Sequence, residues 1–260
     1  MVGIYFSGTG NTKYCVRRFV KEYDQNASDY AIENAQALEA VKEMKESEIL
    51  VFGYSVQYSN LPKMVNDYVT EHVALWKNKK VFIIATMGLF SGDGAGMLAR
   101  LLTKYGAEVV GGLHLRMPDS ICDEKVLKHT DEEDKETITK SEAKIDNAVQ
   151  KLKEGHPTKE GLGFFYHAAG LFGQRLYFYN KTRSYSEKLK INANQCIGCG
   201  LCASRCPMQN IVMKDNAETK KKTAVALGKC TMCYRCVNQC PEKAITLLGT
   251  KVVKQRKMPF

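Results

Sequence analysis

The chain has 260 residues and a mass of 29.2 kDa, and it is 44% hydrophobic and 25% charged. These are ordinary values for a globular protein, so they exclude a collagen-like, coiled-coil or wholly disordered chain. No run of about eighteen residues is free of charged or strongly polar side chains, and no basic segment precedes the short apolar run at the N-terminus. We therefore expect neither a membrane span nor a secretory signal.

The formal net charge of +10 is unevenly distributed. Residues 1–180 carry 22 Lys and Arg against 24 Asp and Glu, whereas residues 181–260 carry 16 against 4. A basic region of this kind is typical of proteins that bind nucleic acid or an anionic membrane. However, the count treats every cysteine as a neutral thiol, and eight of the ten cysteines lie between Cys196 and Cys240.

Apolar, strand-like runs alternate with helical segments through the first part of the chain. The runs cover residues 2–6, 48–53, 79–86 and 109–117. Such alternation indicates right-handed βαβ units, and four or five strands favour an open, doubly wound parallel α/β sheet of about 150 residues over a barrel. Trp76 falls in a helical segment, so we interpret it as a core residue.

Two further helical segments follow. Residues 131–154 begin with acidic and end with basic side chains, which suits the two ends of a helix. Residues 164–179 are aromatic and apolar, and we expect this helix to pack between two domains, with a membrane-surface or dimer contact as the alternatives. Its apolar face consists of Phe165, Ala168, Phe172, Leu176 and Tyr179.

The composition changes to Cys, Gly, Lys and Pro after Lys190. We therefore predict three parts: an α/β domain over residues 1–155, an aromatic helical connector over residues 156–190, and a small cysteine-rich domain over residues 191–260.

The sequence SGTGNT, residues 7–12, follows the first strand and opens a helix. It lacks the Gly-Lys-Ser/Thr ending of a Walker loop, and Lys13 stands where a dinucleotide loop has its third glycine. A hydroxyl-rich loop at a helix N-terminus suits a terminal phosphate, so a mononucleotide is favoured over a dinucleotide, and a simple helix cap is the alternative. The predicted phosphate-binding residues are Ser7, Thr9, Gly10, Asn11 and Thr12.

The SGTGNT string resembles the phosphate loop of flavodoxins, and the resemblance covers residues 1–150. It implies that FMN binds there, with its ring between the loops at residues 54–62 and 86–96. Tyr58 or Phe90 could stack on the ring, or both could be ordinary loop residues. The predicted flavin-binding residues are Ser55, Val56, Tyr58, Asn60, Leu61, Met87, Gly88, Leu89, Phe90 and Gly92.

One cysteine spacing, C-x2-C-x2-C-x3-C-P, occurs twice. The first run is Cys196, Cys199, Cys202 and Cys206, and the second is Cys230, Cys233, Cys236 and Cys240. The spacing is typical of two-cluster ferredoxins, in which three cysteines wrap one [4Fe-4S] cluster and the fourth binds the other cluster. Carried over to this chain, the first cluster takes Cys196, Cys199, Cys202 and Cys240, and the second takes Cys230, Cys233, Cys236 and Cys206.

Structural zinc and disulfides are the alternatives for these cysteines. Zinc sites usually take two separated cysteine pairs, and disulfides need an oxidising compartment, so we favour the clusters. Ile211 and Ile245 stand where small apolar residues would shield them. Two anionic clusters and a flavin phosphate would offset much of the positive charge, so we expect no nucleic-acid partner.

An SGTGNT domain followed by a dicluster domain that ends in CPEKAI resembles the flavodoxin–ferredoxin fusion proteins, over essentially the whole chain. The resemblance implies an electron-transfer protein with FMN and two [4Fe-4S] clusters, which works with ferredoxin-like or flavoprotein partners. The alternative is a flavin-dependent reductase of a small acceptor such as a quinone or nitro compound, fed through its own ferredoxin domain. A homodimer is a further option, and thiolate-bound clusters point to the cytoplasm, particularly of an anaerobe.

Overall fold

The computed structural model forms two compact units. It describes residues 1–58, 60–90, 92–124, 130–172, 176, 184–185 and 187–256. The first unit is formed by Met1–Pro118 and Thr130–Phe178, and the second by Asp119–His129 and Tyr179–Pro259. The short stretch that begins at Asp119 therefore belongs to the second unit, although our predicted boundaries place it inside the first domain.

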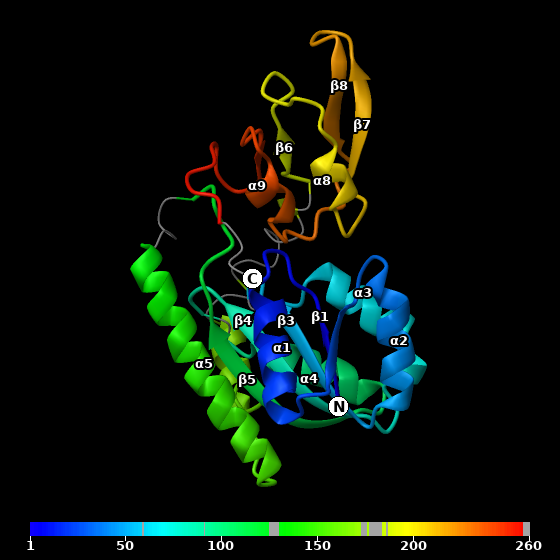
Figure 1. Ribbon diagram of the computed structural model, residues 1–260, viewed down its shortest axis with the longest axis vertical. Helices are drawn as coiled ribbons and strands as arrows, with labels where there is room; N and C mark the ends of the chain where they lie inside the picture. The colour runs from blue at the N-terminus through cyan, green and yellow to red at the C-terminus, as the bar shows by residue number, and fades with distance from the viewer. Residues whose placement is uncertain are drawn as a thin grey trace. The chain divides into compact units, whose positions relative to one another are not determined.

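Five parallel strands form the sheet of the first unit, in the order β2-β1-β3-β4-β5 (Figure 1). They are β1 (Val2–Tyr5), β2 (Ser28–Ala31), β3 (Ile49–Ser55), β4 (Lys80–Met87) and β5 (Glu108–Arg116). This strand order is that of the flavodoxin-like doubly wound α/β fold, so the predicted fold class is confirmed. The sequence SDYA of β2 was not predicted as a strand because it is short, polar and only partly buried.

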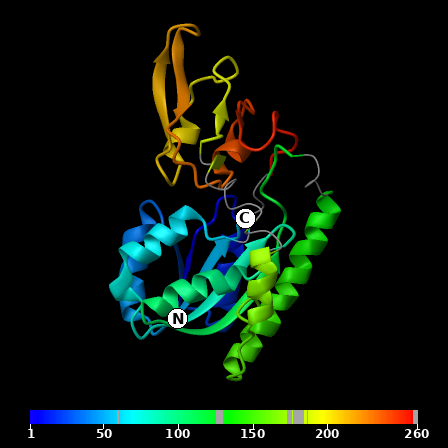
Figure 2. The ribbon, with the colours of Figure 1, turned by 180° about the vertical axis from the view of Figure 1, so that it is seen from behind.

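Helices cover both faces of this sheet. They are α1 (Asn11–Tyr23), α2 (Gln36–Glu46), α3 (Lys63–Glu71), α4 (Gly94–Lys104), α5 (Asp131–Lys153) and α6 (Phe164–Gly170), with a 3-10 turn η1 (Val73–Leu75). Helices α1 and α5 lie on one face, and α4 lies on the opposite face (Figures 1 and 2). The helix predicted over residues 131–154 is confirmed as α5, which begins with a capping box between Thr130 and Glu133.

The core beneath α1 and α5 brings α1 very close to the sheet. Val16, Phe19, Phe82 and Ile145 are fully buried in one cluster, and the rings of Phe19 and Phe82 lie 4.6 Å apart. At Gly53 of β3, an added Cβ would lie 2.2 Å from Val16 Cγ2. Because glycine has no Cβ, α1 can pack directly on β3.

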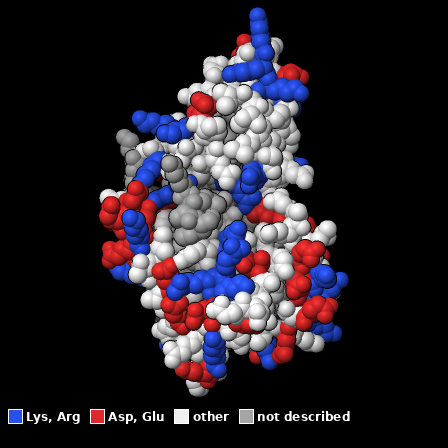
Figure 3. All heavy atoms as spheres, in the orientation of Figure 1, with Lys and Arg blue, Asp and Glu red and all other residues white. Residues whose placement is uncertain are grey.

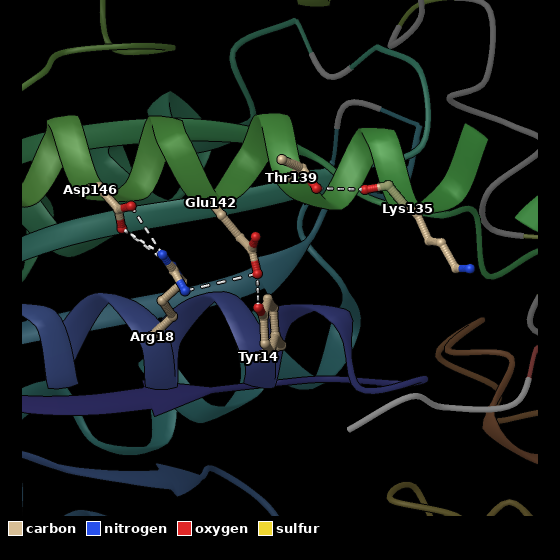
Figure 4. A network of polar contacts seen from close by, with 6 residues as sticks. All are labelled: Tyr14, Arg18, Lys135, Thr139, Glu142 and Asp146. Carbon is tan, nitrogen blue, oxygen red and sulfur yellow. Dashed lines mark hydrogen bonds and ion pairs between the residues drawn. The ribbon is translucent and has the colours of Figure 1, made fainter. Parts of the chain in front are cut away.

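Polar contacts join α1 to α5 at the rim of this core (Figure 4). Arg18 Nη2 donates to both carboxylate oxygens of Asp146 at 3.0 Å, and Arg18 Nη1 lies 3.8 Å from Glu142 Oε1. The Tyr14 hydroxyl donates to Glu142, and burial together with this carboxylate raises the Tyr14 pKa. Since the Arg18 side chain is about one-third exposed, its ion pairs stabilise the fold by no more than about 1 kcal/mol.

The opposite face of the sheet is packed around Trp76. This side chain is fully buried, and its ring stacks on Phe52 at a centroid distance of 5.8 Å. Its indole Nε1 donates to the Val69 carbonyl at 2.9 Å. The interpretation of Trp76 as a core residue is confirmed.

Neutral His114 on β5 makes the first unit sensitive to acid. Burial lowers its pKa from 6.5 to about 4, and its Nε2 accepts a hydrogen bond from Ala95 N at 3.2 Å. The unfolded chain binds a proton at His114 more readily than the folded chain does. The stabilisation that neutral His114 gives the folded state is therefore complete above pH 6.5 and is lost as the pH falls towards 4. We expect a loss of about 2 kcal/mol in the free energy of unfolding between pH 7 and pH 5.

Urea unfolding followed by the fluorescence of Trp76, the one tryptophan, measures this effect. His114→Gln should flatten the pH dependence, whereas the exposed control His156→Gln should retain it. An unchanged slope in His114→Gln would show that other groups cause the acid sensitivity.

The aromatic segment departs from its prediction. Helix α6 forms, but Phe165 is 88% exposed and Phe172 is 74% exposed, so the expectation that this face is packed is wrong for them. Helix α6 is instead anchored by His167, whose Nδ1 lies 2.9 Å from Asp93 Oδ2. Tyr179, also predicted on this face, lies outside the described residues.

The second unit is a small α+β domain, as predicted. Its elements are β6 (Lys190–Ile191), α8 (Leu201–Ser204), β7 (Ile211–Asn216), β8 (Lys221–Ala226), α9 (Arg235–Gln239) and β9 (Ile245–Thr246). Strands β6 and β9 form one antiparallel pair, and β7 and β8 form another. In the part of the chain that the structure describes, no helix is long and apolar enough to cross a membrane.

Candidate functional site

Three loops of the first unit meet at one edge of the sheet. Strands β1, β3 and β4 are parallel neighbours, with Tyr5 paired to Gly53 and Ser55 paired to Thr86. The loops that follow these strands therefore lie side by side at their carboxyl ends, where α/β sheets of this type bind ligands. The predicted phosphate loop and the two predicted flavin loops are these three loops.

The phosphate loop forms a buried turn before α1. Gly10, the residue before α1, has φ +101° and provides no side-chain cap for the helix. The first backbone N–H groups of α1 have no partner within the helix, and they face the loop at its start. Ser7 Oγ accepts a hydrogen bond from Gly10 N at 3.1 Å, and Ser7, Thr9 and Thr12 are all buried. A hydroxyl-lined loop at an uncapped helix start fits a phosphate group.

Two of the predicted phosphate-binding side chains form hydrogen bonds with other segments of the first unit. Asn11 Nδ2 donates to the Pro118 carbonyl at 2.7 Å, and the hydroxyls of Thr12 and Thr86 lie 2.8 Å apart. These contacts fix the loop to the segment that follows β5 and to the end of β4. Phosphate binding by Asn11 and Thr12 stays a prediction. Their backbone N–H groups are the candidate donors to the phosphate.

The first predicted flavin loop is a tight turn after β3. Val56 N donates to the Thr86 carbonyl at 2.8 Å, and Gln57 and Asn60 exchange backbone hydrogen bonds of 3.2 and 2.9 Å. Tyr58 stands inside this turn with φ +50° and is partly exposed. Ser55, Val56, Asn60 and Leu61 are also partly exposed, so the loop can present all five predicted residues to a ligand.

The second predicted flavin loop exposes apolar side chains after β4. Leu89 is 56% exposed and Phe90 is 49% exposed, whereas Met87 and Gly88 are partly buried and Gly92 is buried. Gly92 has φ +57°, a conformation that glycine adopts without strain.

Sequence reasoning missed Asp93, which fixes the end of this second loop. Its carboxylate is fully buried and forms an ion pair with Arg100 Nη2 at 2.6 Å, and its Oδ2 lies 2.9 Å from His167 Nδ1. Its position directly before α4 is a signal for a helix cap. The structure gives it another role, because it connects the loop to both α4 and α6.

The two cysteine runs of the second unit build the same backbone twice. In each run, the residues two and four positions after the first cysteine have positive φ: +74° at Gly198 and Gly200, and +52° and +59° at Met232 and Tyr234. The fourth cysteines are also alike. Cys206 Sγ accepts a hydrogen bond from Asn210 N at 3.2 Å, and Cys240 Sγ accepts one from Ala244 N at 3.3 Å.

Each set of four cysteines lines a hollow of the second unit. One hollow is lined by Cys196, Cys199, Cys202 and Cys240, and the other by Cys206, Cys230, Cys233 and Cys236. The fourth cysteine of each run thus faces the other run's hollow, which is the arrangement that the spacing implies. Ile245 lines the first hollow and Ile211 the second, and both are almost fully buried.

The four cysteines of each set lie in the lining of their hollow. No three His, Cys, Asp or Glu residues within the described ranges are placed to hold a single metal ion. A cubane carries iron at separate corners, so a ring of thiolates around a hollow fits it. Burial raises the pKa of Cys202 and Cys230 to about 11, and iron must therefore displace protons from these thiols.

Two family models match the chain. A flavodoxin domain model matches residues 3–112, and a 4Fe-4S dicluster domain model matches residues 195–244. No curated protein matches.

The solved structures similar to this chain include flavodoxins. The solution structure of two-electron reduced Megasphaera elsdenii flavodoxin is 21% identical and matches 55% of this chain and 99% of that chain, with a TM-score of 0.40. Fusobacterium nucleatum flavodoxin bound to flavin mononucleotide is 18% identical over 60% of this chain and 98% of that chain, with a TM-score of 0.41.

The flavodoxin domain implies FMN, and the dicluster domain implies iron–sulfur clusters. Together they make the chain an iron–sulfur flavoprotein of electron transfer. The chain thus carries a flavodoxin domain followed by a 4Fe-4S dicluster domain.

Proposed function

We propose that the chain binds one FMN and two [4Fe-4S] clusters and carries electrons between them. The observation that supports this most strongly is the pair of hollows in the second unit, each lined by three cysteines of one run and the fourth of the other. FMN exchanges electrons singly or in pairs and each cluster exchanges one, so the combination connects one-electron and two-electron chemistry.

The residues of the chain have separate tasks in this proposal. The buried turn from Ser7 to Gly10 binds the FMN phosphate through hydroxyls and the N–H groups of the first turn of α1. The turn around Tyr58 and the exposed side chain of Phe90 flank the flavin ring. Ile211 and Ile245 exclude water from the two clusters.

A redox partner would meet the second unit at its exposed side chains. Cys199 is exposed, and the neighbouring Ile197 is 55% exposed, so the first cluster has a path to the surface. Exposed lysines gather at the β7–β8 turn, at the top of the view in Figure 3; they are Lys214, Lys220, Lys221 and Lys222. We propose that a redox protein with an acidic surface docks on this unit.

The aromatic segment offers a second contact surface on the first unit. Its exposed side chains are Phe164, Phe165, Tyr166, Phe172 and Leu176. Grouped exposed apolar residues are typical of protein–protein contacts, and a homodimer would bury them.

A second function, reduction of a small acceptor at the flavin, is favoured by the second flavin loop. Leu89 and Phe90 are apolar and about half exposed beside the proposed ring position, so they could form one wall of a substrate site.

An anaerobic absorbance titration tests the carrier function. We expect NADH and NADPH to leave the flavin and cluster absorption unchanged, and a reduced low-potential ferredoxin to bleach both. Bleaching by a nicotinamide would contradict the carrier proposal, because the chain would then accept hydride itself.

A further inference from the structure

The second cysteine run has two residues with positive φ, Met232 and Tyr234, where the first run has glycine. Tyr234 has φ +59°, and its counterpart Gly200 has φ +74°. Glycine adopts this conformation freely, but for a bulky side chain it is unfavourable and persists only where surrounding contacts hold it. Tyr234 is also almost fully buried, so its contacts are made within the protein.

Asp123 holds the side chain of Tyr234. Its Oδ1 accepts a hydrogen bond from the Tyr234 hydroxyl at 2.9 Å, and its Oδ2 accepts from Leu247 N at 2.6 Å and Leu248 N at 3.1 Å. Asp123 is buried, with only 4% of the residue exposed. Three donors to one buried carboxylate are charge-assisted contacts, which makes them strong and directional.

The segment that carries Asp123 is itself fixed within the second unit. The Ser120 carbonyl accepts from Asn238 Nδ2 at 2.9 Å, and the Cys122 carbonyl accepts from Val253 N at 2.7 Å. At Gly249, an added Cβ would lie 1.8 Å from the Asp123 carbonyl oxygen, so the backbone at Gly249 packs directly against the backbone at Asp123. Asp123 therefore reaches Tyr234 from a backbone segment that these contacts hold within the second unit.

Tyr234 lies between Cys233 and Cys236 and lines the same hollow as Cys206. We propose that Asp123 is a positioning residue for the second cluster: it holds Tyr234 in its left-handed conformation and thereby fixes the loop that carries Cys230, Cys233 and Cys236. This inference rests on the proposed cluster assignment. The first cluster needs no such support because Gly200 occupies the equivalent position.

The test measures iron release to a chelator from the full chain with a single cluster. A Cys240→Ala background should retain only the second cluster, and a Cys206→Ala background only the first. Adding Asp123→Ala should speed iron release from the second cluster at least about tenfold, and leave the first unchanged. Tyr234→Phe keeps the ring, so it leaves no cavity, and removes only the hydroxyl that Asp123 holds. It should also speed iron release from the second cluster, but by less than Asp123→Ala.

The combined variant Asp123→Ala/Tyr234→Phe should release iron no faster than Asp123→Ala alone, because both changes remove one contact. Additive effects, unchanged release, or equal acceleration in both backgrounds would overturn the proposal. Asp119→Ala, on the same segment, is the matched control and should behave like its parent. Failure of the Cys240→Ala background to hold a cluster would instead refute the cluster assignment, so the two failures are distinguishable.

Discussion

Cys206→Ala abolishes the cluster formed by the other cysteine run and leaves the cluster of its own run in place. This is the expected result because Cys206 lines the hollow of Cys230, Cys233 and Cys236. Loss of one thiolate ligand removes a [4Fe-4S] cluster, so the iron content should fall from about eight to about four atoms per chain. Iron and sulfide analysis, together with electron paramagnetic resonance of the reduced protein, measures how many clusters remain.

Cys240→Ala should give the mirror result, with loss of the cluster held by Cys196, Cys199 and Cys202. Cys15→Ala is the matched control, since this buried thiol lies on α1, away from both runs in the sequence. If replacing either fourth cysteine removed the cluster of its own run, this result would contradict the crossed arrangement.

Thr9→Asp weakens FMN binding by at least about 100-fold. Thr9 is 6% exposed in the turn before α1, so an aspartate there would place a buried negative charge beside the dianionic phosphate. Fluorescence titration of the chain with FMN measures the dissociation constant. Riboflavin, which lacks the phosphate, should bind wild type and variant more nearly alike.

Thr139→Asp is the control for Thr9→Asp. Thr139 is an exposed residue of α5, and its hydroxyl donates to the Lys135 carbonyl within the same helix (Figure 4). Its replacement should leave FMN binding unchanged. Equal affinities in Thr9→Asp and wild type would mean that the phosphate binds elsewhere.

Local patterns predicted the parts of the molecule that local chemistry determines. Four strands, α5 and the two cysteine loops follow from apolar runs, terminal charges and fixed spacing. The turn before α1 likewise follows from SGTGNT, because glycine and hydroxyl residues favour it. Strand β2 was missed because its four residues carry no apolar alternation, and its neighbour β1 supplies its pairing.

Long-range contacts were not predictable from these patterns. Asp123 and Tyr234 are 111 residues apart, and Asp93 and His167 are 74 apart, so no periodicity relates either pair. The helical spacing of apolar residues predicted α6. Spacing alone does not show which element packs against the apolar face of a helix, and Phe165 on that face is exposed.

Electron exchange within one chain is the central claim, and flash photolysis tests it most directly. A short pulse of a photoreductant under anaerobic conditions reduces a small fraction of the clusters, and the flavin absorbance is then followed at several protein concentrations. The proposal predicts a flavin change whose rate is independent of protein concentration. A rate proportional to protein concentration, or no flavin change while the clusters stay reduced, would contradict it.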